Sequence, residues 1–296
     1  MDLVVRTERI PRPGETVVGR DFVTIPGGKG ANQAAAAARL GVRVDMVGRV
    51  GNDAFGPALL DNMRRQGVGI SHVTLDPDAA SGIAMIMIDA CGENSIVVAA
   101  GANGRVSRSD LEGARELLAQ ARYLLMQFEI PLEVVREAIS LANELGVRVI
   151  LNPAPAHAVD ADLMRGVYCL VANETETEAL TGVAVREEGE LQLAAKRLLG
   201  LGIPVVIVTL GARGAFLASD GLRLLVPARQ VQVVDTTAAG DAFVGGLVAA
   251  FLQGRDLPQA VRYATCAGTL ATTKLGAQTS LPSAAEVEAF FNEGLD

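Results

Sequence analysis

The sequence is poor in residue types that many nucleic-acid-binding and metal-binding proteins use. It has no tryptophan, 4% of its residues are aromatic, and its two histidines, His72 and His157, lie far apart. So few rings argue against a base-stacking surface, and two distant histidines argue against a zinc site or a histidine-based catalytic triad. The net charge of −8 also argues against general affinity for nucleic acid or anionic membranes.

Cysteines and long apolar runs are equally scarce. Cys91, Cys169 and Cys266 have no CxxC spacing and are interpreted as buried or free thiols in a reducing compartment. No stretch reaches the roughly 18 uninterrupted apolar residues of a membrane span, and the first residues are too polar for a secretory signal. We therefore expect a cytoplasmic protein with no nucleic-acid or membrane partner.

The second half of the chain alternates apolar runs with amphipathic segments. Runs at 122–127, 147–153, 167–173 and 204–211 indicate buried strands, and segments at 131–146, 176–182 and 188–202 indicate helices between them. Ser107 and Asp110 have the spacing of a capping box that starts a helix over 107–121. This alternation predicts a parallel sheet covered by helices on both faces.

Two stretches interrupt this pattern. Residues 14–28 and 82–101 resemble strands without an intervening helix, and the second turns at 90–93 to form a hairpin. They form either a small antiparallel flap or an extension of the main sheet, and periodicity does not separate these alternatives. A flap would suit a reaction from which water must be excluded.

The stretch DTTAAGD, residues 235–241, places two carboxylates around small residues just before an apolar helix that ends at Gly254. Ala238, Ala239 and Gly240 leave the backbone N–H groups at the helix start open to an anion. Asp241 is then placed to accept a proton from a hydroxyl. A purely structural interpretation, in which Asp241 complements the helix dipole and Asp235 caps a turn, explains the motif about equally well.

A second glycine-rich loop, PGGKGANQA, also runs into an alanine-rich helix. It matches neither the common P-loop nor the dinucleotide-binding fingerprint. Lys29 and Asn32 are suited to bind sugar hydroxyls. A tight turn alone accounts for the glycines, but not for these two polar side chains together.

Polar residues also follow the predicted strands, and ligands of open α/β sheets bind at the carboxyl ends of strands. The loop at 209–214 follows one strand in this way. One edge of the sheet would thus collect Glu129, Asn152, Asn173, Glu176, Thr209 and Asp241. This set predicts an active cleft.

The motifs PGGKGANQA, NPAPA, NETE, TLGARG, DTTAAGD and GAQTSLP occur in the order found in PfkB carbohydrate kinases. The chain resembles the ribokinase branch of that family over essentially its whole length. The resemblance implies a single domain over 1–296, a three-layer α/β/α sandwich with a mostly parallel central sheet. It also implies a small antiparallel β lid, with segments at about 3–6, 15–26 and 82–100.

The resemblance further implies transfer of the ATP γ-phosphate to the 5-hydroxyl of D-ribose. Asp241 would be the catalytic base, beside an anion hole formed by Ala238, Ala239 and Gly240. The sugar would contact Asp2, Gly28, Lys29, Gly30, Asn32 and Glu129. ATP would contact Asn173, Glu176, Thr209, Leu210, Gly211, Ala212, Arg213, Gly214, Gly240 and Thr265.

By the same resemblance, Mg²⁺ would accompany ATP and K⁺ would activate the enzyme. The K⁺ ligands would be Asp235, Thr237, Ala271, Lys274, Gly276 and Ser280, and the lid would form a homodimer contact. A kinase for another pentose, deoxyribose or a nucleoside is an alternative, as is a non-catalytic sugar-binding protein.

The chain departs from the family at its start, because family members have a strand before the acid that Asp2 matches. Two explanations are a true start upstream of Met1 and a genuine short form, and we favour the first.

Overall fold

The computed structural model describes residues 1–293. Its main sheet has six strands in the order β12-β11-β10-β9-β8-β7. These are β7 (Tyr123–Met126), β8 (Arg148–Leu151), β9 (Val167–Asn173), β10 (Val205–Thr209), β11 (Ala215–Ser219) and β12 (Leu222–Val226). Strands β7 to β10 pair in parallel, and β11 and β12 close the edge in antiparallel.

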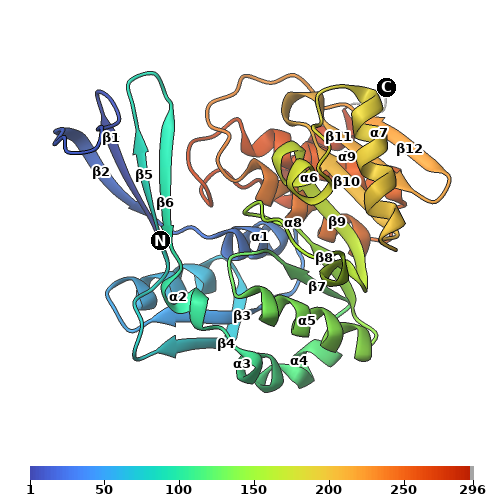
Figure 1. The fold of residues 1–296 in the computed structure, drawn as a ribbon, viewed down its shortest axis with the longest axis horizontal. Helices are drawn as coiled ribbons and strands as arrows, with labels where there is room; N and C mark the ends of the chain where they lie inside the picture. Colours follow the sequence, from blue (N-terminus) through green and yellow to red (C-terminus); the bar gives the residue numbers. More distant parts are fainter. Residues whose placement is uncertain (294–296) are drawn as a thin grey trace.

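Helices cover both faces of this sheet (Figure 1). One layer contains α5 (Leu132–Glu144), α6 (Glu174–Thr181) and α7 (Glu188–Gly200), and the other contains α8 (Ala239–Leu252), α9 (Leu257–Ala271) and α10 (Ala284–Asn292). Successive residues of one strand enter opposite cores, since Val149 and Leu151 pack with the first layer and Ile150 packs with the second. This explains why the central strands are continuously apolar and confirms the predicted three-layer sandwich.

A parallel pair, β3 (Val44–Gly51) and β4 (Val68–Asp76), lies apart from the main sheet with α1 (Lys29–Arg39) and α2 (Phe55–Arg65). Within residues 1–293, β3 pairs only with β4, and β7 pairs only with β8. Three short elements precede β7, namely η1 (Gly101–Arg105), α3 (Arg108–Gly113) and α4 (Arg115–Ala119). Two others lie within the main-sheet part of the chain: η2 (Ala161–Met164) between β8 and β9, and η3 (Gly211–Arg213) between β10 and β11.

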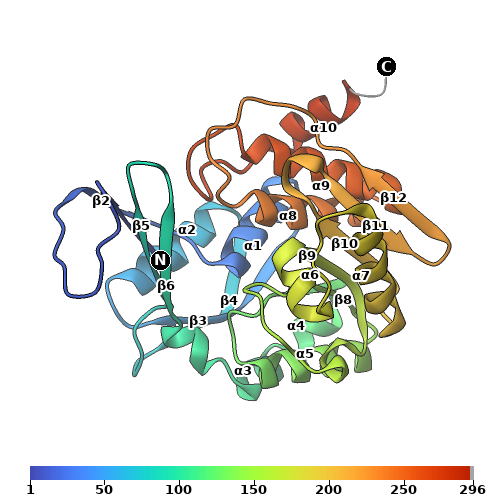
Figure 2. The same ribbon diagram turned by 45° about the horizontal axis from the view of Figure 1, so that its top comes forward.

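A separate four-stranded sheet projects from the body at the left of Figure 1 and again in Figure 2. It consists of β1 (Asp2–Thr7), β2 (Gly19–Ile25), β5 (Ile83–Ile88) and β6 (Asn94–Ala99), in the order β2-β1-β5-β6. The hairpins β1–β2 and β5–β6 are antiparallel, and they join through a parallel β1–β5 contact. Of the two sequence-based alternatives, the flap is therefore the observed one, and we call this sheet the lid.

Two element boundaries differ from the sequence prediction. Residues 15–18, expected within a lid strand, form no strand, because the pairing of β1 with β2 ends at Thr7 and Gly19. The predicted helix over 107–121 divides into α3 and α4 at Ala114. Its predicted capping box between Ser107 and Asp110 is present.

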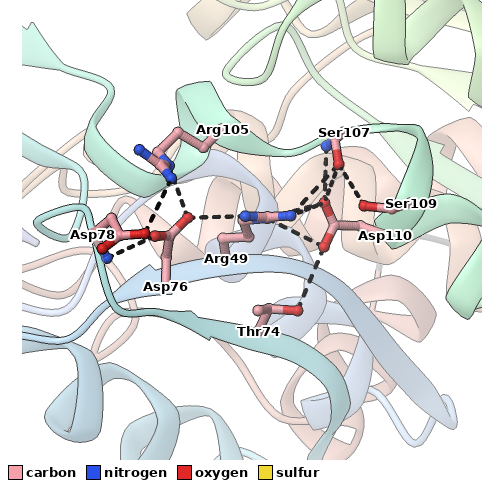
Figure 3. A network of polar contacts seen from close by, with 8 residues as sticks. All are labelled: Arg49, Thr74, Asp76, Asp78, Arg105, Ser107, Ser109 and Asp110. Carbon is pink, nitrogen blue, oxygen red and sulfur yellow. Dashed lines mark hydrogen bonds and ion pairs between the residues drawn. The ribbon is translucent and has the colours of Figure 1, made fainter.

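A polar network joins the base of the lid to the body (Figure 3). Asp76 lies where the chain leaves β4 toward the lid, and Arg105 lies where the chain returns; Asp76 accepts hydrogen bonds from Arg49 and Arg105 at 2.9 and 3.0 Å. Arg49 also donates to both oxygens of Asp110, at the start of α3. These contacts hold the two ends of the lid excursion together. Within residues 1–293, no helix combines the length and apolar character needed to cross a bilayer.

Candidate active site

The helix start after DTTAAGD is the centre of the candidate site. Helix α8 begins at Ala239, and Ala238 before it has φ 59°, the one positive φ outside glycine in residues 1–293. A left-handed alanine costs on the order of 1–2 kcal/mol, and such strain is concentrated at functional sites. The Ala239 N–H donates to the carbonyl of Thr236, whereas Gly240 lies in the first turn, where amides lack intrahelical acceptors.

Asp241 lies in that first turn and is 8% exposed. Its Oδ2 accepts a hydrogen bond from Asn32 Nδ2 at 3.0 Å, and its Oδ1 accepts one from Gln33 Nε2 at 2.9 Å. Burial raises the pKa of Asp241, and the charge of Lys29 and the two amide donors oppose that rise. The result is a fixed, desolvated carboxylate at a helix N-terminus, which is suited to accept a proton.

The glycine-rich loop brings α1 against the loop that follows β7. The backbone N–H of Lys29 donates to Oε2 of Glu129 at 2.8 Å. Gly28, with φ 98°, provides a turn that L-residues rarely adopt. Burial raises the pKa of Glu129, and the Lys29 N–H and charge counter it.

Asp2, at the start of β1, extends the polar cluster from the lid side. A Cβ on Gly27 would lie 2.2 Å from Oδ2 of Asp2, so a larger residue there would push the Asp2 carboxylate out of place. Burial raises the pKa of Asp2, and the N-terminal ammonium and Lys29 lower it. Asp2, Glu129 and Asp241 interact electrostatically with one another and with Lys29, so the site combines three acids with one cation.

Further residues follow β9 and β10. Asn173 caps α6 by accepting from the Glu176 N–H at 2.8 Å, and the Glu176 carboxylate accepts from the backbone and side chain of Asn173. Asn173 of β9 and Thr209 of β10 are paired partners in the parallel register of these two strands. Arg213 in the loop after β10 donates to Glu174 at 2.6 Å, so the NETE and TLGARG segments form one surface.

The side-chain hydrogen bond of Thr265 does not involve this surface. Thr265 is 7% exposed in α9, and its hydroxyl donates to the Val261 carbonyl within the same helix. Because this hydrogen bond stays within α9, the assignment of Thr265 to ATP depends on the resemblance alone.

Three of the six predicted K⁺ ligands meet around Asp235. Its Oδ1 accepts from the N–H and hydroxyl of Thr237, and its Oδ2 accepts from the Gly276 N–H at 2.9 Å. Although burial raises it, these donors hold the pKa of Asp235 below its usual range. Ser280 is fully buried nearby in sequence, and Ala271 and Lys274 lie at and just beyond the end of α9.

Two buried glutamines, Gln33 and Gln278, were not among the predicted site residues. Gln33 lies within the motif PGGKGANQA, and Gln278 lies within GAQTSLP. Gln33 contacts Asp241 directly, and Gln278 Nε2 donates to Asn32 Oδ1 at 3.1 Å. A glutamine inside an otherwise alanine-rich helix was the available signal, because a buried amide needs partners.

Comparison with known proteins places these features in a family. The model of the pfkB family carbohydrate kinases matches residues 1–284. A ribokinase of Haemophilus influenzae is 39% identical over 289 residues, covering 98% of this chain and 94% of the relative. A deoxyribokinase of Salmonella typhi is 37% identical over 297 residues, covering 100% and 95%.

Solved structures agree with this. A ribokinase of Arabidopsis thaliana in complex with ribose and ATP superposes with a TM-score of 0.90 at 31% identity, covering 98% of this chain and 95% of that one. A ribokinase of Thermotoga maritima also gives a TM-score of 0.90, at 33% identity, covering 98% and 96%. With the whole-chain family match and these relatives, the chain belongs to the pfkB family of carbohydrate kinases.

Proposed function

We propose that this protein transfers the γ-phosphate of ATP to the 5-hydroxyl of D-ribose. The observation that carries the proposal is Asp241, a buried carboxylate fixed by two amides at the strained start of α8. Several relatives of similar length are named ribokinases, and one related structure contains ribose and ATP. Together they favour ribose as the substrate.

In the proposed mechanism, Asp241 accepts the proton of the sugar hydroxyl as that oxygen attacks the γ-phosphorus. The transferring phosphoryl group lies at the N-terminus of α8, where Ala238 and Gly240 supply backbone N–H groups and the helix dipole favours negative charge. The Ala239 N–H is already bonded to Thr236 and would have to leave that partner to join them. Catalysis is therefore mainly positioning and electrostatics, as expected for phosphoryl transfer.

The sugar would lie between α1 and the lid. Asp2, Lys29, Asn32 and Glu129 surround the approach to Asp241. A Cβ on Gly28 would point toward Glu129, whereas a Cβ on Gly30 would press on Gln127 and Met46, so Gly30 permits the close packing of α1. Carboxylates accept from sugar hydroxyls, and the ammonium and amide groups donate to them. Because Asp2 belongs to a lid strand, closure of the lid would complete the sugar site.

ATP would lie along the surface formed by Asn173, Glu176 and the 209–214 loop, with Mg²⁺ arriving on its phosphates. The Glu176 oxygens already accept from Asn173, so Glu176 suits a water-mediated contact with the ion, which usually keeps several waters.

K⁺ fits the chain near Asp235. The predicted donor set there is a carboxylate, a hydroxyl and backbone carbonyls, and oxygen ligands are what a hard cation requires. Asp235 Oδ1 accepts two hydrogen bonds from Thr237, whereas Oδ2 accepts one from Gly276 and retains lone-pair capacity for a cation. When bound, K⁺ would supply positive charge beside the anion hole.

A homodimer through the lid is also proposed. Apolar side chains of the lid face solvent, including Phe22, Val97 and Val98, which are 59%, 60% and 64% exposed. Val97 pairs across the sheet with Met85, which is 54% exposed, and exposed apolar surface of this kind marks contact sites. Sedimentation of Val97→Asp should show a monomer, while Leu193→Asp, at an exposed position on α7, should leave the oligomeric state unchanged.

The function is tested with purified protein, ATP, Mg²⁺ and a panel of ribose, 2-deoxyribose, other pentoses and nucleosides, with K⁺ varied. We expect ribose to be phosphorylated fastest and K⁺ to raise the rate. Faster turnover of deoxyribose would favour the deoxyribokinase alternative, which the Salmonella relative supports. Ribose binding without phosphorylation of any substrate would favour the non-catalytic alternative.

The hypothesis of a strand upstream of Met1 stays a prediction. Within residues 1–293, β3 and β7 each have a partner on one side only, so each has backbone groups available to a further strand. Two versions of the protein, one starting at Met1 and one carrying the upstream codons, should be assayed side by side. If only the extended version phosphorylates ribose, the upstream strand is required.

A further inference from the structure

Two chains of side-chain amides converge on the Asp241 carboxylate, one on each oxygen. In the first chain, Gln33 donates through Nε2 to Asp241 Oδ1 and also to Asn152 Oδ1, both at 2.9 Å. Gln33 Oε1 accepts from Gln127, and Asn152 Nδ2 donates to the backbone carbonyl of Val171 at 2.9 Å. Every polar atom of the Gln33 side chain is therefore engaged, and the residue is fully buried.

The second chain reaches the other oxygen from the opposite side. Asn32 Nδ2 donates to Asp241 Oδ2 at 3.0 Å, and Gln278 Nε2 donates to Asn32 Oδ1 at 3.1 Å. Gln278 Oε1 accepts in turn from Asn62 Nδ2 of α2 at 2.6 Å. Gln278 is 4% exposed, and its own carbonyl accepts from Arg39, which ties its loop to α1.

The partners at the ends of the two chains determine which atom of each amide donates and which accepts. A backbone carbonyl only accepts, so Val171 requires the Nδ2 of Asn152, which turns Asn152 Oδ1 toward Gln33 and the Gln33 Nε2 toward Asp241. A carboxylate also only accepts, so Asp241 requires the Nδ2 of Asn32. In each chain the amide next to Asp241, Gln33 in the first and Asn32 in the second, therefore presents an N–H to the carboxylate.

Asn32 and Gln33 contact Asp241 directly, and their partners Gln278, Asn152 and Gln127 lie one step farther out. Without those partners, the side-chain amides of Asn32 and Gln33 could rotate and exchange the positions of their oxygen and nitrogen. The oxygen and nitrogen of a primary amide have nearly the same shape, and their orientation follows from hydrogen bonds alone. An Asn32 with no donor at its Oδ1 can turn that oxygen toward a protonated Asp241 and accept its O–H, which would stabilise the neutral acid instead of the carboxylate. Gln278 prevents this for Asn32, and Asn152 and Gln127 prevent it for Gln33.

We propose that Gln33 and Gln278 are positioning residues for Asp241, holding its carboxylate ionised and in one orientation while a sugar hydroxyl approaches. The inference depends on the proposed role of Asp241 as base. Neither glutamine is needed to contact sugar or ATP. Hydrogen bonds to a charged group are stronger than those between neutral groups, so these two donors oppose the cost of burying this carboxylate.

Other charges also face Asp241 and must be held constant in any test. Lys29 at the start of α1 favours the ionised form, whereas Asp2 of the lid disfavours it. Glu129 after β7 and Glu176 of α6 are also within electrostatic range of Asp241. The test variants therefore change neutral amides only, to methionine, which has a similar length and no N–H.

The experiment measures kcat and KM for ribose and ATP, across pH, in wild type, Gln33→Met, Gln278→Met and the control Gln192→Met. Gln192 lies on the exposed surface of α7 and bonds only Glu188. We expect kcat at neutral pH to fall about tenfold or more for Gln33→Met, the loss of one charged hydrogen bond, with KM for ATP unchanged. We also expect the acid limb of kcat/KM for ribose to move upward by about one pH unit.

Gln278→Met should move the acid limb in the same direction by a smaller amount, because it acts through Asn32. Activity of both variants should recover at high pH, and Gln192→Met should match wild type. A loss of activity with an unmoved acid limb, or no change in either variant, would overturn the proposal. If Gln278→Met does not fold, Asn62→Leu at the half-buried outer end of the same chain replaces it, with the same expected direction.

Failure of the proposed function would be recognised separately. If wild type phosphorylates no pentose, the ¹³C shift of the Asp241 carboxyl, titrated in wild type and in both glutamine variants, still reads the amide chains. A titration midpoint that is higher in the variants supports the proposal, and equal midpoints overturn it.

Discussion

Replacing Asp241 by asparagine removes the proposed proton acceptor with almost no change in size. Both carboxylate oxygens accept an amide N–H, from Asn32 and from Gln33. An asparagine retains one acceptor oxygen and places an NH₂ group against the second donor. The variant therefore loses the base and also one of its two hydrogen bonds.

The size of the effect follows from these losses. A positioned general base commonly contributes about 10²–10⁴-fold, which corresponds to about 2.7–5.4 kcal/mol of activation free energy. We expect Asp241→Asn to lower kcat for ribose by at least ~10²-fold. KM for ATP should change little, because the predicted ATP residues follow β9 and β10.

The same substitution should also change how the free energy of unfolding depends on pH. Burial raises the pKa of Asp241 in the folded protein, so its contribution to stability is fully present below the unfolded pKa of about 3.9. That contribution is lost as pH rises through the folded pKa. Asparagine does not titrate, so the variant should escape this loss, and its free energy of unfolding should fall less between acid and neutral pH than that of wild type.

The assay is ATP-dependent phosphorylation of ribose, together with urea denaturation at acid and neutral pH. Asp61→Asn, on the exposed surface of α2 and paired with Arg65, is the matched control and should change neither readout. Near-wild-type turnover of Asp241→Asn would refute its role as base. A fall in stability between acid and neutral pH that is as large in the variant as in wild type would refute the argument from burial.

Three further substitutions test other parts of the site. Gly27→Ala places a Cβ 2.2 Å from Oδ2 of Asp2 and should raise KM for ribose about tenfold or more, because the sugar loses a charged hydrogen bond. KM for ATP should stay unchanged. The control Gly189→Ala has open space around it in α7 and should stabilise the protein by about 0.5–1 kcal/mol. Asp235→Asn should abolish activation by K⁺, measured by titrating KCl against choline chloride, and a variant that K⁺ still activates would remove Asp235 from the cation site. Ala238→Val should lower the free energy of unfolding by about 1–2 kcal/mol, because a β-branched residue is a poor fit at φ 59°; urea denaturation that shows no loss would contradict the strain.

Local sequence patterns predicted the central strands closely. The predicted strand at 167–173 coincides with β9, and the helix predicted at 131–146 contains α5. Strands buried on both faces are continuously apolar, so their limits are visible in the chain itself. The lid segment predicted at about 15–26 forms a strand only from Gly19, because a strand also needs a partner and the pairing with β1 ends there.

The residues of the candidate site also differ in whether a local sequence pattern reveals them. Asp241, Lys29 and Glu129 were identified in sequence because charged residues next to glycines and strand ends are conspicuous. Gln33 and Gln278 were not, since an amide has no special significance until its partners are known. Gln278 lies 246 residues from the Asn32 that it orients, and no local pattern encodes that contact.

The sequence by itself determined the alternation of strands and helices, the glycine-rich turns and the chemical groups available at the strand ends. These follow from residue volume, hydrophobic period and backbone freedom, which act over a few residues. Only the tertiary structure decided that the hairpins form a separate lid, that Ala238 takes a left-handed conformation, and that two amide chains meet at Asp241. Those features depend on contacts between distant segments, whose burial and hydrogen bonds come into being only when the whole chain packs.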